Sequence, residues 1–558
     1  MQRSRWYKDA FIYQIYPRSF CDSNGDGIGD IRGIISKLDY LQELGVNAVW
    51  LSPCYKSPND DNGYDISNYR DIMDEFGTLE DWEEMVDGMH KRGIKLIMDL
   101  VVNHSSDEHF WFQEALKGKD NPYRDYYIWR KGRGKNGKRP PNNWTSRFGG
   151  SAWEYHEDSG EYYLHLFTKK QPDLNWDNPK VRQEVHDIVK YWLDKGCDGF
   201  RCDVITYISK KEGLPNGKLN VALLGDEHFT HGPNIHAYLH ALNKEVLSKY
   251  DCMTVGEGPG MNVKHAIDYT SEEREELDTV FTFEHMHTDA FFQFLPRKLK
   301  LSRLKKVLAA YQYGLRDKGW NSLYWENHDQ PRSIPRFTGD FGDKRKEAAK
   351  MLAVALYMQQ GTPYVYQGQE IGMMNYPWKS IDEFQDVMVK NLMGIFNKYA
   401  PFLKKVAFWA LKKKGRDNAR TPMQWNDKEN AGFTTGTPWL PINPNYKEIN
   451  VEQAMKDKNS IFHFYKKLIA FRRGNPLIIH GTFKENYASS NDIYCYERWY
   501  KGERLMVICN FKNKEIPFKL PSDCVYKSAD LVLHNYDYDR KLEDMTLRPY
   551  EALVFKMI

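Results

Sequence analysis

The feature that most constrains the fold is a long alternation of short apolar runs with amphipathic helical segments. Eight runs have the length and composition of buried strands: 11–16, 48–51, 96–102, 199–204, 253–256, 280–284, 322–325 and 363–366. Helical patterns occupy most of the intervals between them, such as 79–91, 181–195 and 346–359. Eight strands with intervening helices predict an α/β fold in which a parallel sheet closes into a (β/α)8 TIM barrel.

Three stretches do not follow this alternation. Residues 105–178 are rich in Trp, Tyr, Asn, Gly and Pro and are too long for a plain loop, so we expect an excursion domain inserted after the third strand. A second insertion follows the eighth strand. Short alternating runs near the end predict antiparallel strands. We therefore expect a barrel made of 1–104 and 179–477, an excursion domain of 105–178 and a C-terminal β domain of 478–558.

Charge and cysteine content exclude several function classes. Lys and Arg number 79 against 76 Asp and Glu, which gives no basic footprint for nucleic acid. No run of about 18 apolar residues predicts a membrane span, and the N-terminal residues have no apolar signal core. The eight cysteines form no Cys-x-x-Cys pair, so we expect free thiols and a cytoplasmic location.

Charged residues gather where the predicted strands end. Because active sites of such barrels lie at the carboxyl ends of their strands, these positions are the first candidates for catalysis. Segments with such charged residues end the third, fourth, fifth and seventh predicted strands. They are DLVVNH at 99–104, GFRCDVI at 199–205, TVGE at 254–257 and ENHD at 326–329.

Two of these carboxylates have the environments that glycoside cleavage requires. Arg201 and Asp203 are two residues apart on a strand and point to the same side, so the guanidinium should lower the pKa of Asp203. Glu257 lies between glycines without a basic neighbour in sequence, and an unpaired buried glutamate has a raised pKa. A charged nucleophile beside a protonated acid cleaves glycosides. The alternative, ion pairs that only stabilise the barrel rim, accounts poorly for the whole set.

The strand-end strings resemble, in order and spacing, the four signature regions of family 13 glycoside hydrolases, the α-amylase family. The resemblance covers essentially the whole chain and is closest to the bacterial oligo-1,6-glucosidase and dextran glucosidase subgroup. Further shared strings are YQIYPRSF at 13–20, DNGYD at 61–65, QPDLN at 171–175 and RDNARTP at 416–422.

The resemblance implies a role for each site residue. Asp203 would be the nucleophile, Glu257 the general acid/base and Asp329 the third catalytic carboxylate. The family retains anomeric configuration, which places the nucleophile and acid about 5–5.5 Å apart. A zinc site at the histidines is disfavoured because no cluster has metal-ligand spacing. The glucose pocket would be lined by Asp61, Tyr64, His104, Arg201, His328 and Arg420.

Val204, which follows the nucleophile, bears on linkage. Valine here resembles relatives that prefer α-1,6 bonds. The alternative is that it is an ordinary β-branched strand residue.

We expect a retaining, exo-acting α-glucosidase that removes terminal α-1,6-linked glucose from isomaltose and short isomalto-oligosaccharides through a covalent glucosyl-enzyme intermediate. The alternatives are a broader α-glucosidase active on α-1,4 bonds or sucrose, and a sucrose isomerase or transglucosidase. Glu326, Gly258 and Thr206 depart from the subgroup's pattern and leave acceptor preference open.

The segment 22–30 carries oxygen-bearing side chains at alternate positions around glycines, an arrangement that suits calcium. The resemblance implies a structural Ca²⁺ or Mg²⁺ held by Asp22, Asn24, Asp26, Asp30 and the Ile28 carbonyl. The alternative is a metal-free series of Asx turns. We expect no cofactor in catalysis, a small oligosaccharide as substrate, no nucleic-acid or membrane partner, and a monomer or weak homo-oligomer.

Overall fold

The computed structural model describes residues 3–219, 223–291, 295–537 and 540–558. At its centre lies an eight-stranded parallel sheet in the order β11-β10-β9-β5-β2-β1-β15-β14. A parallel bridge between Val280 and Asn321 joins the two ends of that order, so the sheet closes and the predicted (β/α)8 barrel is confirmed. The strands are β1 Ile12–Ile15, β2 Ala48–Leu51, β5 Lys95–Leu100, β9 Gly199–Cys202, β10 Met253–Glu257, β11 Thr279–Phe281, β14 Ser322–Leu323 and β15 Thr362–Tyr366.

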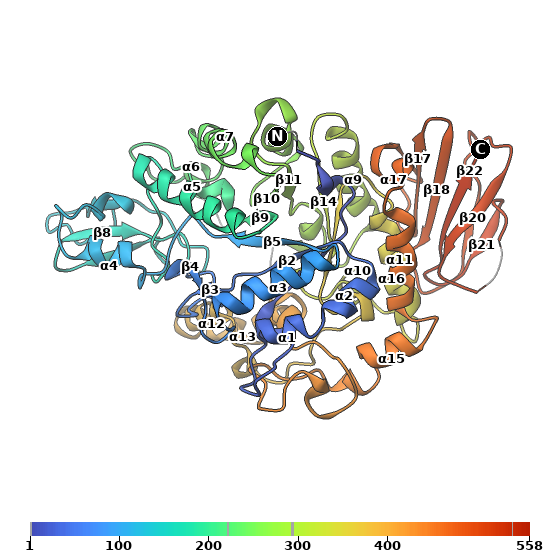
Figure 1. Cartoon of the computed structure of the whole chain (residues 1–558), viewed down its shortest axis with the longest axis horizontal. Helices are drawn as coiled ribbons and strands as arrows, with labels where there is room; N and C mark the ends of the chain where they lie inside the picture. The colour runs from blue at the N-terminus through green and yellow to red at the C-terminus, as the bar shows by residue number, and fades with distance from the viewer. Residues whose placement is uncertain (1–2, 220–222, 292–294, 538–539) are drawn as a thin grey trace.

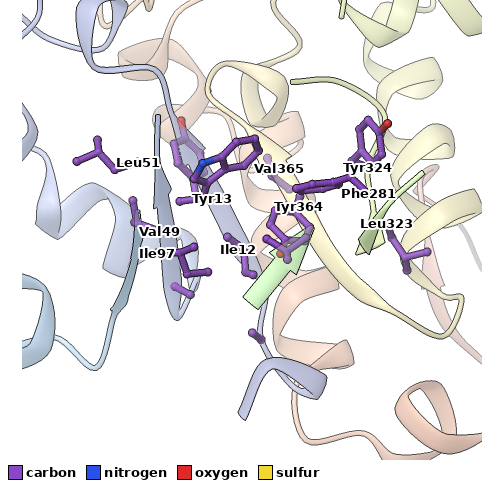
Figure 2. Packing of buried hydrophobic residues seen from close by; sticks show 14 of the residues in the cluster. Ile12, Tyr13, Val49, Leu51, Ile97, Phe281, Leu323, Tyr324, Tyr364 and Val365 are labelled. Atoms are coloured by element: carbon purple, nitrogen blue, oxygen red, sulfur yellow. The ribbon is translucent and has the colours of Figure 1, made fainter. Parts of the chain in front are cut away.

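Side chains from these strands fill the barrel interior and the layer around it. Most of the strand positions are fully buried, as expected for parallel strands covered by helices. Figure 2 shows part of this packing, with labelled residues from β1, β2, β5, β11, β14 and β15. The covering helices include α3 Leu79–Lys91, α5 Pro179–Asp194, α7 Ile235–Glu245, α9 Leu301–Gly314 and α11 Arg345–Tyr357.

The sequence of α3 shows why such a helix forms and packs. Thr78 and Asp81 form a reciprocal capping box that satisfies free amide groups of the first turn. The buried residues Trp82, Met85 and Met89 recur at helical spacing, so one face meets the barrel while the charged face meets solvent.

The chain between β5 and α5 forms a small antiparallel sheet, at the left of Figure 1. It consists of β6 Trp129–Lys131, β8 Glu161–Leu164 and β7 Trp153–His156, in that order. Its apolar cluster also contains Val204, Tyr207 and Phe229, which follow β9 in sequence. The excursion segment is therefore packed directly onto the carboxyl end of a barrel strand.

The C-terminal strands form a five-stranded antiparallel sheet at the opposite side of the molecule (Figure 1). Its order is β16 Thr482–Asn486, β17 Ile493–Tyr500, β18 Glu503–Asn510, β22 Ala552–Met557 and β20 Ala529–His534. The segment after β15 contains two further helices, α12 Val387–Tyr399 and α13 Lys404–Lys414. In the described part of the chain, no helix combines the length and apolar character that crossing a bilayer requires.

Candidate active site

A cavity of about 290 Å³ lies at the carboxyl ends of the barrel strands. Asp203, Glu257 and Asp329 reach it from the ends of β9, β10 and β14. Its walls also come from the excursion segment, through Phe148 and Phe167, and from the segment after β15. Three regions that are distant in sequence therefore enclose one pocket. The predicted residues that line it are Asp61, Tyr64, His104, Asp203, Val204, Glu257 and Asp329.

Arg201 lies behind the pocket and joins three carboxylates. Its Nη1 lies 2.6 Å from Oδ1 of Asp203 and 2.6 Å from Oδ1 of Asp99, and its Nη2 lies 2.7 Å from Oε2 of Glu257. The guanidinium is 2% exposed, so water screens these contacts little. The expectation that Glu257 is unpaired is therefore wrong: its partner comes from the neighbouring strand, which sequence distance hides.

Burial dominates the protonation of this group. It raises the pKa of Asp203 to about 7, against the attraction of Arg201. It also raises the pKa of Glu257 to about 7. The predicted rise at Glu257 is confirmed, whereas the predicted lowering at Asp203 is wrong, because one cation is shared among three buried carboxylates. Two coupled carboxyls release their protons in separate steps, so the pair holds one proton near neutral pH.

Asp329 has the opposite environment. Its Oδ1 lies 2.8 Å from Nη2 of Arg420 and 3.4 Å from Nη1 of Arg416, and its Oδ2 lies 3.3 Å from Nε2 of His328. Burial alone would raise the pKa of Asp329, but His328 and the two guanidinium groups hold it well below its usual range. Asp329 is therefore a permanently charged hydrogen-bond acceptor at the pocket wall.

Next to Asp329, on the other side of the His328 imidazole, lies a hydrogen-bonded network around Tyr64. Its hydroxyl lies 2.7 Å from Nε2 of His328, and its carbonyl oxygen lies 2.9 Å from Nε2 of His104. Gln171 donates to that carbonyl and to Asp61. Burial lowers the pKa of His104 to about 4 and that of His328 to about 3, so both imidazoles are neutral at pH 7. The wall is thus fixed in shape and rich in hydrogen-bonding groups.

The structure brings all the predicted catalytic and pocket residues together, though in two layers. Arg201, His328 and Arg420 are not in the cavity lining and instead hold the carboxylates that are. Two contributors received no role from sequence: Asp99, which shares Arg201, and Arg416, which pairs with Asp61 and Asp329. Both residues lie in the segments 99–104 and 416–422 that already stood out in the sequence. Their position near the site could therefore be predicted from sequence, but their ion-pair partners could not.

Val204 lies just beyond β9 and has a left-handed backbone conformation, with φ 35° and ψ 40°. A β-branched residue adopts positive φ only under constraint from its surroundings. The alternative of an ordinary strand residue is therefore wrong. Its side chain lines the cavity, and its amide N–H donates a hydrogen bond of 2.9 Å to Oε2 of Glu257.

The three positions that depart from the subgroup differ in their placement. Glu326 lies outside the cavity lining, where its carboxylate pairs with Arg332 and accepts from Ser333. It therefore supports the chain path after β14 and does not line the pocket. Thr206 and Gly258 lie closer to the pocket. The Thr206 hydroxyl donates to the carbonyl of Pro259, a lining residue, and a Cβ on Gly258 would lie 2.5 Å from Cε of Met261.

The segment 22–30 folds as a chain of Asx turns. Asp22 accepts from the amides of Asn24, Gly25 and Gly27, and Asp26 accepts from that of Ile28. Among the described residues, no three His, Cys, Asp or Glu side chains form a group that could hold a metal. A cation here would therefore depend on Asn24 and the Ile28 carbonyl as well as the acidic side chains, a set of hard oxygen donors that suits Ca²⁺ or Mg²⁺.

Comparison with known proteins agrees with this geometry. The α-amylase catalytic domain family matches residues 14–481. An oligo-1,6-glucosidase of Parageobacillus thermoglucosidasius is 58% identical over 99% of both chains. A trehalose-6-phosphate hydrolase of Bacillus licheniformis is similar in structure, with a TM-score of 0.94, 47% identity and 99% coverage of each chain. An isomaltulose synthase of Klebsiella sp. LX3 has a TM-score of 0.95, 42% identity and 99% coverage of each chain. The chain belongs to the α-amylase family and is a glycoside hydrolase.

Proposed function

We propose that this chain is a retaining, exo-acting α-glucosidase that hydrolyses terminal α-1,6-linked glucose from isomaltose and short isomalto-oligosaccharides. The observation that carries the proposal is the pair of Asp203 and Glu257, both bound to Arg201 at one side of a small pocket and both with a pKa near neutrality. One proton shared by such a pair supplies an acid and a nucleophile at the same pH.

The reaction proceeds in two displacements. In the first, Glu257 gives its proton to the glycosidic oxygen while a carboxylate oxygen of Asp203 attacks the anomeric carbon, which breaks the glycosidic bond and forms a covalent glucosyl ester. In the second, Glu257 takes a proton from water, the water oxygen attacks the same carbon, and Asp203 leaves as a carboxylate. Both substitutions invert the centre, so its configuration is retained overall.

The pocket walls supply binding and charge. Asp329, held ionised by Arg420 and Arg416, accepts hydrogen bonds from glucose hydroxyls and faces the positive charge that develops on the sugar ring. Asp61 and Tyr64 are placed to bind the remaining hydroxyls. The pocket's 290 Å³ suits one terminal sugar better than a long chain, which favours exo action.

The α-1,6 preference rests on Val204 and on the relatives. Val204 lines the cavity next to both proposed catalytic carboxyls. Oligo-1,6-glucosidases of P. thermoglucosidasius and Bacillus cereus are 58% and 56% identical to this chain.

Initial rates on isomaltose, maltose, sucrose and trehalose 6-phosphate test the assignment. We expect isomaltose to be cleaved fastest, with activity abolished in Asp203→Asn. Faster cleavage of maltose or trehalose 6-phosphate would refute the linkage claim but not the chemistry. Conversion of sucrose to an isomer without net hydrolysis would favour the sucrose isomerase alternative, for which the similar isomaltulose synthase is the supporting observation.

Three further properties belong to the proposal. A structural Ca²⁺ or Mg²⁺ is held by the 22–30 segment, with no part in the chemistry. The enzyme is cytoplasmic, which suits eight buried, free cysteines. It is a monomer or a weak homo-oligomer.

A further inference from the structure

The helical hairpin formed by α12, the turn Pro401–Leu403 and α13 is unusually basic. Residues 387–414 contain seven lysines and no Asp or Glu. Since the whole chain carries +3 and this segment +7, the rest of the molecule carries −4. The two helices pack against each other (Figure 1), and Met388 of α12 and Lys414 of α13 line the active-site cavity.

The same hairpin exposes apolar side chains. The inner faces of the two helices pack through Val389, Met393, Ala407 and Leu411 in a small apolar cluster. A second apolar face remains outside, at Ile395, Phe402, Leu403, Val406 and Trp409. Helices in soluble proteins ordinarily have polar residues on the face opposite the core, so a second apolar face requires an explanation.

These exposed residues form a stripe that ends at the tip of the hairpin. Phe402, Val406 and Trp409 are spaced by four and three residues, which places them along one side of the chain entering α13. Phe402 lies in the turn and is 80% exposed. The apolar stripe is therefore open to solvent at the end of the hairpin.

Lysines flank the stripe without acidic partners. In the described residues, Lys390, Lys404, Lys405, Lys412 and Lys413 have no carboxylate within ion-pair distance, whereas Lys414 pairs with Asp289. Lys413 lies over the ring of Trp409, 4.9 Å from its centroid. The positive charge of this surface is therefore available to an outside anion.

We propose that the α12–α13 hairpin docks on an anionic lipid bilayer surface, which replaces the expectation from sequence that the chain has no membrane partner. An exposed aromatic and aliphatic stripe flanked by lysines is the arrangement with which amphipathic helices enter the boundary between headgroups and acyl chains. The lysine stems lie along the apolar layer while their ammonium groups meet anionic headgroups.

The hairpin suits a second copy of the chain less well. A symmetric dimer would place the same patch against itself, so two sets of seven lysines would face each other.

Met388 of α12 and Lys414 of α13 line the active-site cavity. Docking by this hairpin would therefore place the lipid surface on the segment that also forms part of the pocket wall.

Co-sedimentation of the full-length protein with vesicles tests the proposal. One set of vesicles contains phosphatidylcholine alone and the other equal parts of phosphatidylcholine and phosphatidylglycerol. We expect binding to the anionic vesicles only, weakened by added salt. Phe402→Ser combined with Trp409→Ser should lower the affinity for anionic vesicles by about tenfold or more, as should Lys404→Glu combined with Lys405→Glu.

The matched control is Val525→Ser, which also replaces an exposed apolar side chain by serine but lies in the C-terminal region, outside the hairpin. Val525 is 77% exposed, and this variant should bind vesicles as the wild type does. Isomaltose hydrolysis at the wild-type rate verifies that each variant is folded, since none of the changed residues lines the cavity. Equal binding to both kinds of vesicle, or unchanged binding by the double variants, would refute the proposal. So would a dimer in sedimentation velocity that the Phe402/Trp409 variant dissolves while vesicles bind no protein.

Discussion

The amide N–H of Val204 donates a 2.9 Å hydrogen bond to Oε2 of Glu257, the same oxygen that Arg201 contacts. Val204 directly follows Asp203, so the chain path after the proposed nucleophile also orients the proposed acid/base. The backbone of Val204 itself is left-handed, which turns the chain away from the direction of β9 directly after the proposed nucleophile. The proposed roles in linkage preference, proton donation and nucleophilic attack thus meet at one residue.

Replacing Val204 by alanine should shift linkage preference. The shorter side chain opens the acceptor side of the pocket, so the ratio of kcat/KM for isomaltose to that for maltose should fall by about tenfold, the usual effect of losing one or two methyl groups in a pocket. Initial rates on both disaccharides measure it. An unchanged ratio would mean that linkage is chosen elsewhere, while a uniform loss on both substrates would indicate that Glu257 has moved.

The two proposed catalytic carboxyls should respond differently to the leaving group. Asp203→Asn removes the nucleophile and should lower kcat by on the order of 10³-fold or more on every substrate. Glu257→Gln should be as severe on isomaltose but much milder on an aryl glucoside, whose phenolate leaves without a proton. Steady-state rates on both substrates decide this. Equal losses of Glu257→Gln on the two substrates would argue against its role as the acid.

The pH profile of kcat/KM should be bell-shaped. The active form has one proton on the Asp203–Glu257 pair, and burial raises the pKa of each to about 7, so activity should fall both when the pair gains a second proton and when it loses its last one. Arg201→Gln removes the cation that favours ionisation and should move both limbs to higher pH. Limbs that stay in place in this variant would show that Arg201 does not set the protonation of the pair.

Glu257→Gln should stabilise the folded protein, and the gain in free energy of unfolding should grow as the pH rises. The folded-state pKa of Glu257 is raised from 4.5 to about 7, so the folded chain binds more protons than the unfolded chain between these values and loses stability with increasing pH. Glutamine avoids that loss. The gain should be small near pH 4 and reach at most about 3 kcal/mol above pH 7, since one pKa unit corresponds to about 1.4 kcal/mol. Thermal unfolding at several pH values measures it, and a gain that is the same at acid and neutral pH would contradict the assignment.

Calcium should stabilise the fold through the 22–30 segment. After treatment with a chelator, added Ca²⁺ should raise the Tm of the wild type, because a ligand that binds only the folded state stabilises it. Asp26→Ala should keep the fold and lose this response, since Asp26 Oδ1 accepts only from the amide of Ile28 within the segment. A wild type whose Tm is unaffected by chelator and Ca²⁺ would support the metal-free Asx-turn alternative.

The predictions from sequence agree best with the structure for features that follow from the local pattern of apolar residues. All eight predicted barrel strands are present, because runs such as 48–51 and 363–366 are apolar enough to be buried on both faces. The candidate residues were found for the same reason: a polar side chain at the end of such a run has few places to lie other than the barrel mouth.

Disagreement arises where neighbours come from other strands. Glu257 has no cation within its own string, and only the parallel pairing of β9 with β10 brings Arg201 to it. Arg416 reaches Asp61 across 355 positions in sequence. Glu326 departs from the subgroup's pattern, but its carboxylate is paired with Arg332 and lies outside the cavity lining.

The sequence by itself determined the barrel, the identity of the candidate carboxyls and the order in which the chain presents them, since these follow from hydrophobic periodicity and side-chain type. Only the tertiary structure decided which cation each carboxylate shares, how burial raises the pKa of both Asp203 and Glu257, and the strained backbone of Val204. The physical reason is that electrostatic energies depend on distance and desolvation in space, and neither quantity can be obtained from separation along the chain.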